Sequence, residues 1–163
     1  MYPLPYNRQI SMVRILHLKG NLLNSLLGEI SWLFNDAFCQ FTHFHLAFNV
    51  DLCYKNGSFL NRVARTTCPD RFRGAPEGHI SVTVPGHNRG SGIGHHHIPA
   101  KFLKPALPTG SGKDKFALIL VGDSAGQIHP ITTYRKKKRE VQLGGSWFAC
   151  KDICPAYPFD FNQ

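Results

Sequence analysis

Two groups of side chains in this sequence have residue types and a spacing that suit chemistry. The first is three consecutive histidines, His95 to His97, with His129 further along the chain. An imidazole can take a proton from water near neutral pH, and a neutral imidazole is a common metal ligand. The second is a run of five cations over residues 135–139, which suits a polyanion. The sequence therefore suggests two kinds of site, one for metal-assisted hydrolysis and one for phosphate binding.

The segment Gly94-His95-His96-His97-Ile98-Pro99 resembles the first motif of the His-Me finger nucleases, in particular their GHH group. The resemblance implies that His96 is the general base that activates water. It also implies that His95 and His129 are ligands of one divalent metal ion at the scissile phosphate. The metal ion would neutralise the charge that develops during hydrolysis. A metal-dependent phosphodiesterase is therefore the enzymatic alternative for this protein.

The same histidines also resemble part of the histidine triad of the cupins, which hold one metal ion inside a β-barrel. This resemblance implies that His95, His97 and His129 are the metal ligands. A solvated tract without bound metal is the alternative to both resemblances. One divalent metal ion is the only cofactor that the sequence suggests.

The cations of the second group repel one another, so we expect them to be exposed and to lie near a polyanion. A second basic group occurs between residues 62 and 73. The nine residues that we expect to contact nucleic acid are Arg62, Arg65, Arg71, Arg73, Arg135, Lys136, Lys137, Lys138 and Arg139. The formal net charge of +9, from 19 Lys and Arg against 10 Asp and Glu, points the same way. Non-enzymatic binding to the phosphate backbone is the leading prediction.

Residues 117–143 resemble the KOW motif of ribosomal and transcription-elongation proteins. They contain a strand, a glycine turn with Gly122, Ala125 and Gly126, a second strand, a basic turn and a third strand. The resemblance implies that RNA contacts the two turns. The basic run also fits a nuclear localisation signal.

Two further motifs are better explained as turns. Residues 107–113 resemble the Walker A loop of helicases, but Asp114 occupies the position of the hydroxyl that binds magnesium. Residues 122–126 match the G-x-S-x-G nucleophile elbow, but Pro130 and β-branched residues follow where the elbow needs a helix. We therefore expect neither motif to be catalytic.

The elements that must position these side chains are one helix and several strands. Apolar residues at helical spacing predict an amphipathic helix over residues 10–36. This helix could contact a partner or a membrane surface. From Phe44 to Tyr54 apolar and polar residues alternate, which predicts a strand, and Asn56-Gly57 predicts a hairpin turn after it.

We therefore predict an α+β fold, in which a long N-terminal amphipathic helix packs on a mostly antiparallel sheet or small β-barrel. Residues 1–163 form a single small basic domain. After the helix, its segments are a hairpin and strand region at 43–85, a mobile Gly/His/Pro-rich loop at 86–112, a basic β segment at 116–150 and an extended tail at 155–163.

The composition also bears on the location of the protein. No apolar run reaches the ~18 residues of a membrane-spanning helix, and five cysteines without a C-x-x-C pair do not indicate a disulfide framework. We therefore expect an intracellular protein of the nucleus or cytoplasm. The basic, acid-free N-terminus is also typical of a mitochondrial targeting segment. Because several motif fragments occur and none is complete, a spurious reading frame without a defined activity is a third alternative.

Overall fold

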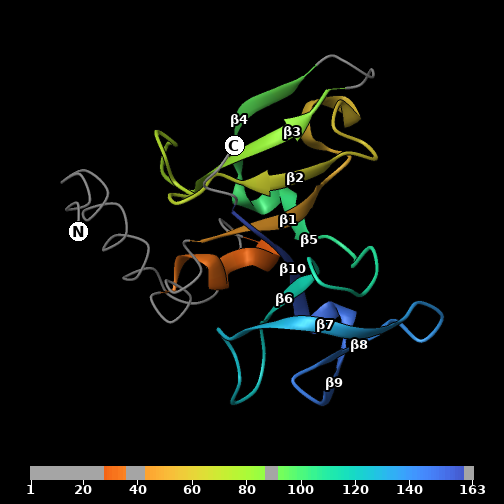
Figure 1. The fold of residues 1–163 in the computed structure, drawn as a ribbon. Coiled ribbons are helices and arrows are strands. Elements are labelled where there is room, and N and C mark those ends of the chain that lie inside the picture. Colours follow the sequence, from red (N-terminus) through yellow and green to blue (C-terminus); the bar gives the residue numbers. More distant parts are fainter. Residues whose placement is uncertain (1–27, 36–42, 87–91, 160–163) are drawn as a thin grey trace.

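The computed structural model describes residues 28–35, 43–86 and 92–159, and these form a twisted antiparallel sheet. The strand order is β4-β3-β2-β1-β10-β6-β7-β8-β9, and β5 pairs with β1 (Figure 1). The strands are β1 Phe44–Val50, β2 Val63–Thr66, β3 His79–Pro85, β4 Ile93–Pro99, β5 Leu103–Pro105, β6 Phe116–Ile119, β7 Ile128–Arg135, β8 Glu140–Leu143, β9 Ser146–Ala149 and β10 Ile153–Pro158. Short 3-10 helices precede or connect them, namely η1 Gly28–Phe34, η3 Tyr54–Gly57, η4 Ala100–Phe102 and η5 Cys150–Asp152. None of the helices in the described ranges has the length and apolar character needed to cross a membrane.

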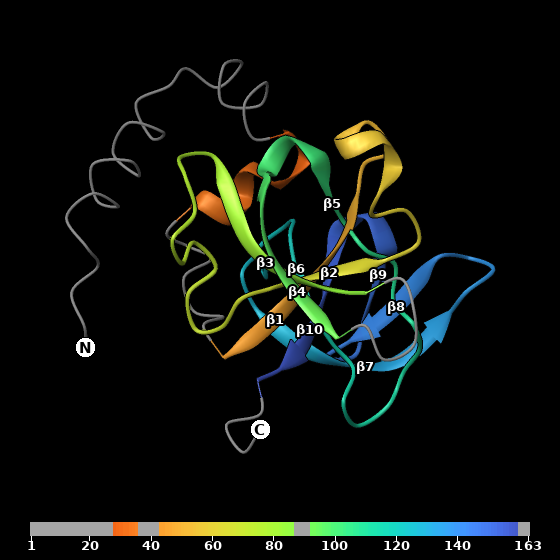
Figure 2. The same cartoon turned by 90° about the horizontal axis from the view of Figure 1, so that it is seen from above.

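Strand β10 joins two halves of the sheet that are each continuous in the sequence. One half contains β1 to β5, and the other contains β6 to β9. β10 pairs with β1 on one side, where Ala156 faces Leu46, and with β6 on the other, where Ile153 faces Ile119. Figure 2 shows β1 and β10 next to each other near the middle of the molecule. The described strands of the two halves are therefore held in one sheet through β10.

Apolar side chains pack in two clusters on opposite faces of the central strands. Leu118 of β6 and Cys154 of β10 belong to the cluster that η1 covers. Their neighbours Ala117 and Ile153 belong to the cluster beneath β7 and β8. Because both faces of β6 and β10 are buried, these strands carry continuous apolar runs instead of an alternating pattern.

The prediction of an α+β fold with a long N-terminal helix packed on the sheet is wrong, because the described chain is mostly antiparallel β-sheet. Of the predicted helix at 10–36, the structure describes residues 28–35, which form the 3-10 helix η1. This helix begins at Gly28, whose φ of +60° does not belong to a continuous right-handed helix. Three apolar residues of η1, namely Ile30, Leu33 and Phe34, are buried all the same. Residues 10–27, with the predicted targeting or membrane-contacting segment, lie outside the described residues.

The predicted mobile loop at 86–112 contains two strands instead. Strand β4 pairs with β3 along its whole length, from Ile93 opposite Pro85 to Pro99 opposite His79, and β5 pairs with β1. An edge strand is held by backbone hydrogen bonds and needs few buried side chains. In β4 only Ile98 is fully buried, so its composition resembles that of a loop.

The predicted C-terminal tail also belongs partly to the sheet. Residues 155–158 complete β10, although Pro155 and Pro158 cannot donate backbone hydrogen bonds. Near the other end of the chain, β1 covers the first seven residues of the predicted strand and ends at Val50. The Asn56-Gly57 pair lies in η3, with φ values of +53° and +74°, and β2 then pairs antiparallel with β1. Residues 122–126 lie in the connection between β6 and β7, without a following helix.

Candidate nucleic-acid interface

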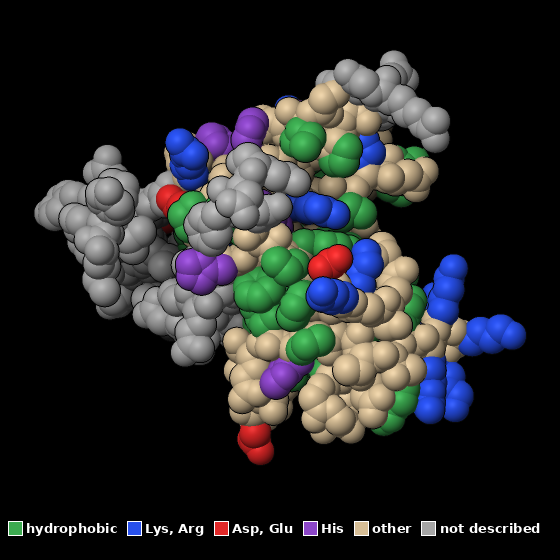
Figure 3. Space-filling model, in the orientation of Figure 1, with side chains coloured by type: hydrophobic (Ala, Val, Ile, Leu, Met, Phe, Trp, Pro, Cys, Tyr) green, Lys and Arg blue, Asp and Glu red, His purple; other side chains and the backbone are tan. Residues whose placement is uncertain are grey.

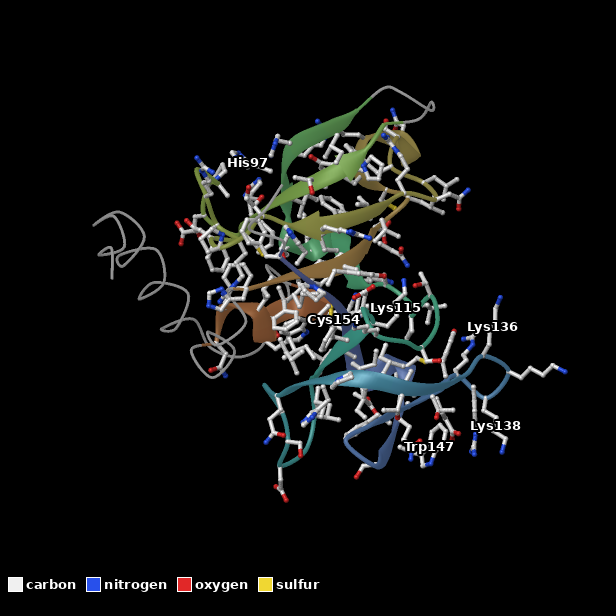
Figure 4. The ribbon with its side chains drawn as sticks, in the orientation of Figure 1. His97, Lys115, Lys136, Lys138, Trp147 and Cys154 are labelled. Carbon is white, nitrogen blue, oxygen red and sulfur yellow. The ribbon has the colours of Figure 1, made fainter. Side chains whose placement is uncertain are left out.

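Five consecutive cations, residues 135–139, surround the turn of the β7–β8 hairpin, and we call this segment the basic tip. β7 ends at Arg135, which faces Glu140 at the start of β8. The amide of Lys138 donates to the carbonyl of Arg135 at 3.1 Å and closes the turn. All five side chains are exposed. Lys136 points away from the body of the protein (Figure 4).

The charge of the basic tip is largely uncompensated. Nη1 of Arg135 lies 3.9 Å from Oε2 of Glu140, and both side chains are exposed, so this ion pair contributes little to stability. Figure 3 shows Lys and Arg side chains gathered at the tip, with no Asp or Glu visible beside them on this face. Adjacent like charges with few acidic neighbours attract counterions or a polyanion.

Trp147 lies beside the basic tip on the outer face of the β7–β8–β9 segment. In β9, Trp147 faces Gln142 and Ala149 faces Glu140, which in turn faces Arg135. Residues that face each other in register point to the same side of a sheet, and so do residues two apart. These five residues therefore share one face. The opposite face, with Val141 and Phe148, packs in the second apolar cluster.

The indole of Trp147 is partly open to solvent. The Cζ atom of Arg135 lies 3.9 Å from the centroid of the indole ring, which is a cation–π contact. The residue remains 39% exposed. One aromatic side chain with an accessible surface therefore lies directly next to the five cations.

A groove of about 410 Å³ begins beside the basic tip. Four cations from three elements line it, namely Lys104 of β5, Lys138 and Arg139 of the basic tip, and Lys151 of η5. The acidic residue in the lining is Glu29, whose Oε1 lies 3.7 Å from Nζ of Lys104. Ala149 lines the groove as well, which connects it to the face that carries Trp147. The groove therefore has a net positive lining that continues the charge of the tip.

The second predicted basic group, between residues 62 and 73, does not form one patch. The buried Arg71 donates from Nε and Nη2 to the carbonyl of Leu33, at 3.2 and 2.9 Å. Arg62 donates to the carbonyls of Ser58 and Pro85. Two of the four arginines therefore bind the backbone of their own chain.

The other two arginines of this group are exposed. The Cζ atom of Arg65 lies 4.1 Å from the ring centroid of Tyr157 in β10. Arg73 lies in the turn before β3, where its amide donates to the carbonyl of Asp70. Of these four arginines, Arg65 and Arg73 therefore present exposed side chains that a phosphate can reach.

The structure does not bring the predicted metal ligands together. Along β4, His95 and His97 are exposed on one face, and His96 points to the other, with its ring 5.0 Å from that of Phe59. His129 lies on β7, and five strands separate β7 from β4 in the sheet. Figure 4 shows His97 far from the basic tip. Among the described residues, no group of three His, Cys, Asp or Glu side chains is arranged to hold a metal ion.

The surroundings of His96 affect its protonation. Burial lowers the pKa of His96 below its ordinary value of 6.5, and the charges of Lys55, Arg62 and His95 lower this pKa further. The imidazole is therefore neutral at pH 7. Its described surroundings contain cations and the ring of Phe59, which suit a neutral ring that packs in the structure.

The sequence analysis missed Trp147, Lys104 and Lys151, because strand pairing places Trp147 beside the basic tip and the groove brings the two lysines to it. One signal in the sequence did point to Trp147. Gly144 and Gly145, with φ values of +55° and +86°, connect β8 to β9 in the manner of a two-residue type I′ turn. Two glycines between Leu143 and Ser146 predict this hairpin, and the hairpin places Trp147 opposite Gln142.

Comparison with protein-family models and with curated proteins found no match to this sequence. The resemblances to His-Me finger nucleases, cupins and the KOW motif therefore depend on their short motifs alone. The fold and the candidate site define a basic, antiparallel β protein with a cationic hairpin as its most distinctive surface feature.

Proposed function

We propose that this protein binds nucleic acid without catalysis, and that its phosphate contacts lie at the basic tip and in the adjoining groove. The observation that carries the proposal is the run of five exposed cations at one hairpin turn. Such a turn neutralises phosphates and releases their counterions, so the affinity depends on salt and little on sequence.

Two properties of the hairpin support this proposal. The register of β7 with β8 fixes the backbone on both sides of the turn, so the cations occupy a defined place. The three lysines of the tip are exposed to solvent, where a phosphate can reach them. We also propose a nuclear or cytoplasmic location, with a mitochondrial location as the alternative, because nucleic acid occurs in all three, and the five cations can serve as a nuclear localisation signal.

The test compares two triple variants with the same net charge. One replaces the tip residues Lys136, Lys137 and Lys138 with Ala. The control replaces Lys55, Lys101 and Lys113, which are exposed and lie outside the tip and the groove lining. Binding to a labelled single-stranded oligonucleotide is measured by fluorescence anisotropy between 50 and 200 mM salt.

We expect the tip variant to bind more weakly, with a slope of log affinity against log salt that is less steep by about 2. The control keeps the wild-type slope. Equal losses in both variants would show that net charge alone drives binding, and the tip assignment would fail. No binding by the wild-type protein would end the proposal altogether.

The non-catalytic part of the proposal has its own readout. The same binding mixtures, incubated with Mg²⁺ or with EDTA, are run on a denaturing gel. We expect the oligonucleotide to stay intact in both, because the described histidines do not form a metal site. Cleavage that requires Mg²⁺ and is lost in His96→Ala would instead establish the nuclease alternative.

A further inference from the structure

Trp147 offers a surface that phosphate binding alone does not use. One side of its indole carries the guanidinium of Arg135 at 3.9 Å, and the residue is still 39% exposed. Large aromatic side chains are usually more buried, since their exposure costs free energy. An indole that is held by a cation and open to solvent is a surface on which a nucleobase can stack.

The stacking surface and the cationic groove form one path. Ala149 lies two residues from Trp147 on the same side of β9, or about 7 Å along the strand, and it lines the groove. A chain whose base covers the indole can therefore continue with its phosphates past the groove cations, Lys104, Lys138, Arg139 and Lys151. The tip supplies further cations at the edge of this path.

The placement of Trp147 favours single strands over duplexes. Trp147 lies within strand β9, opposite Gln142 and in contact with Arg135, so it is not at a projecting loop tip from which it could wedge between base pairs. The bases of a duplex are stacked inside the helix and cannot lie flat on such a surface, whereas the bases of a single strand can.

We propose that the preferred ligand is single-stranded nucleic acid, RNA or DNA, with one base stacked on Trp147 and the adjoining phosphates in the groove. This inference depends on the proposed function, because it specifies which form of nucleic acid the basic tip binds.

The test uses three labelled probes of equal length, namely a single strand, its duplex, and a single strand of abasic nucleotides. The abasic strand keeps the phosphates and lacks the bases. We expect wild-type protein to bind the single strand about 5- to 100-fold more tightly than the abasic strand. Trp147→Leu should lose this difference and bind the abasic strand as the wild type does.

A second measurement keeps Trp147 in place. The chain has two tryptophans, so Trp32→Phe leaves Trp147 as the only one. We expect the single strand to quench the fluorescence of Trp147, because stacking places a base against the indole. The abasic strand, at a concentration that saturates binding, should leave this fluorescence nearly unchanged.

The outcomes separate this inference from the proposed function. If the single strand, the duplex and the abasic strand bind equally and Trp147→Leu changes nothing, the single-strand inference is overturned. The proposed function still stands in that case, provided that the triple lysine variant of the tip weakens binding. If no probe binds the wild-type protein, both proposals fail together.

Discussion

At the scale of single residues, the arginines divide into those that bind their own chain and those that face solvent. Arg71 is 9% exposed and donates twice to the carbonyl of Leu33, which ties the loop before β3 to η1. Arg73, two positions later, is exposed. The two arginines carry the same charge in the sequence. Their packing in the fold shows that Arg71 is structural, whereas the exposed Arg73 can contact a ligand.

Replacing Arg71 with Ala should therefore destabilise the fold. The variant removes both hydrogen bonds to the Leu33 carbonyl, and we expect the free energy of unfolding to fall by about 1 to 3 kcal/mol. Arg73→Ala is the matched control and should change it by less than about 0.5 kcal/mol. Urea denaturation measures both. A stable Arg71→Ala protein would show that these hydrogen bonds contribute little.

His96 should make stability depend on pH. Its pKa in the folded protein is below the ordinary value of 6.5, so between these two values the unfolded chain binds the proton more strongly. The free energy of unfolding should therefore decrease as the pH falls through about 6.5. In His96→Gln this decrease should be smaller, as measured by urea denaturation from pH 7.5 to 5. If the free energy of unfolding depends on pH in the same way in both proteins, His96 is not the source of the pH dependence.

At the scale of elements, the β8–β9 turn determines where Trp147 lies. Gly145 has a φ of +86°, and no atom lies within 4 Å of the place where a Cβ would be. A substitution at Gly145 thus tests backbone conformation without a steric clash. Both glycines of this turn have left-handed backbone, which matches the twist of strands β8 and β9.

We expect Gly145→Ala to lower the free energy of unfolding by about 1 to 2 kcal/mol, because residues with a Cβ disfavour this conformation. Gly145→Asn should cost less, since Asn tolerates left-handed backbone. Thermal unfolding of the wild type, Gly145→Ala and Gly145→Asn ranks the three proteins by stability. If Ala and Asn cost the same, the turn does not require the left-handed conformation at this residue.

The elements that the sequence predicted best are those whose own side chains carry the pattern. Leu46, Phe48 and Val50 are buried in β1, as their alternation indicates. By contrast, β4 is held by the backbone of β3 and contains one fully buried side chain, so no apolar pattern marks it. β10 contains two prolines, which are typical of an extended tail, so the sequence does not predict that this segment is a central strand.

The same reasoning applies to the candidate site. The basic tip is a local run, and its exposure follows from charge repulsion along the sequence. Lys104 and Lys151 come from distant segments and meet the tip only in the groove. Arg71 was assigned to nucleic acid by its charge, but a carbonyl of η1 holds it. Contacts of this long-range kind depend on the whole fold and could not be predicted from composition or spacing.

At the scale of the whole molecule, the two apolar clusters share β6 and β10, so the halves of the sheet should unfold together. Leu118→Ala creates a cavity in the first cluster, and we expect a loss of about 2 to 5 kcal/mol. Trp32 reports on the first half, because it packs on Phe48 of β1, and Trp147 reports on the second.

Single-tryptophan variants allow each half to be followed by fluorescence. Urea midpoints from Trp32→Phe and Trp147→Phe, each with and without Leu118→Ala, should show the same shift in both halves. A shift confined to the Trp32 signal would mean that the second half remains folded on its own, and the shared strands would then not couple the two clusters.

The position of β10 also has a consequence for synthesis of the chain. Residues 153–158 follow β1 to β9, so the ribosome produces both halves of the sheet before the strand that joins them. Until then β6 and residues 44–46 of β1 have an open edge, and an open edge can pair with a second nascent chain. The protein is therefore most exposed to mispairing late in its synthesis, after β9 is made and before β10 arrives.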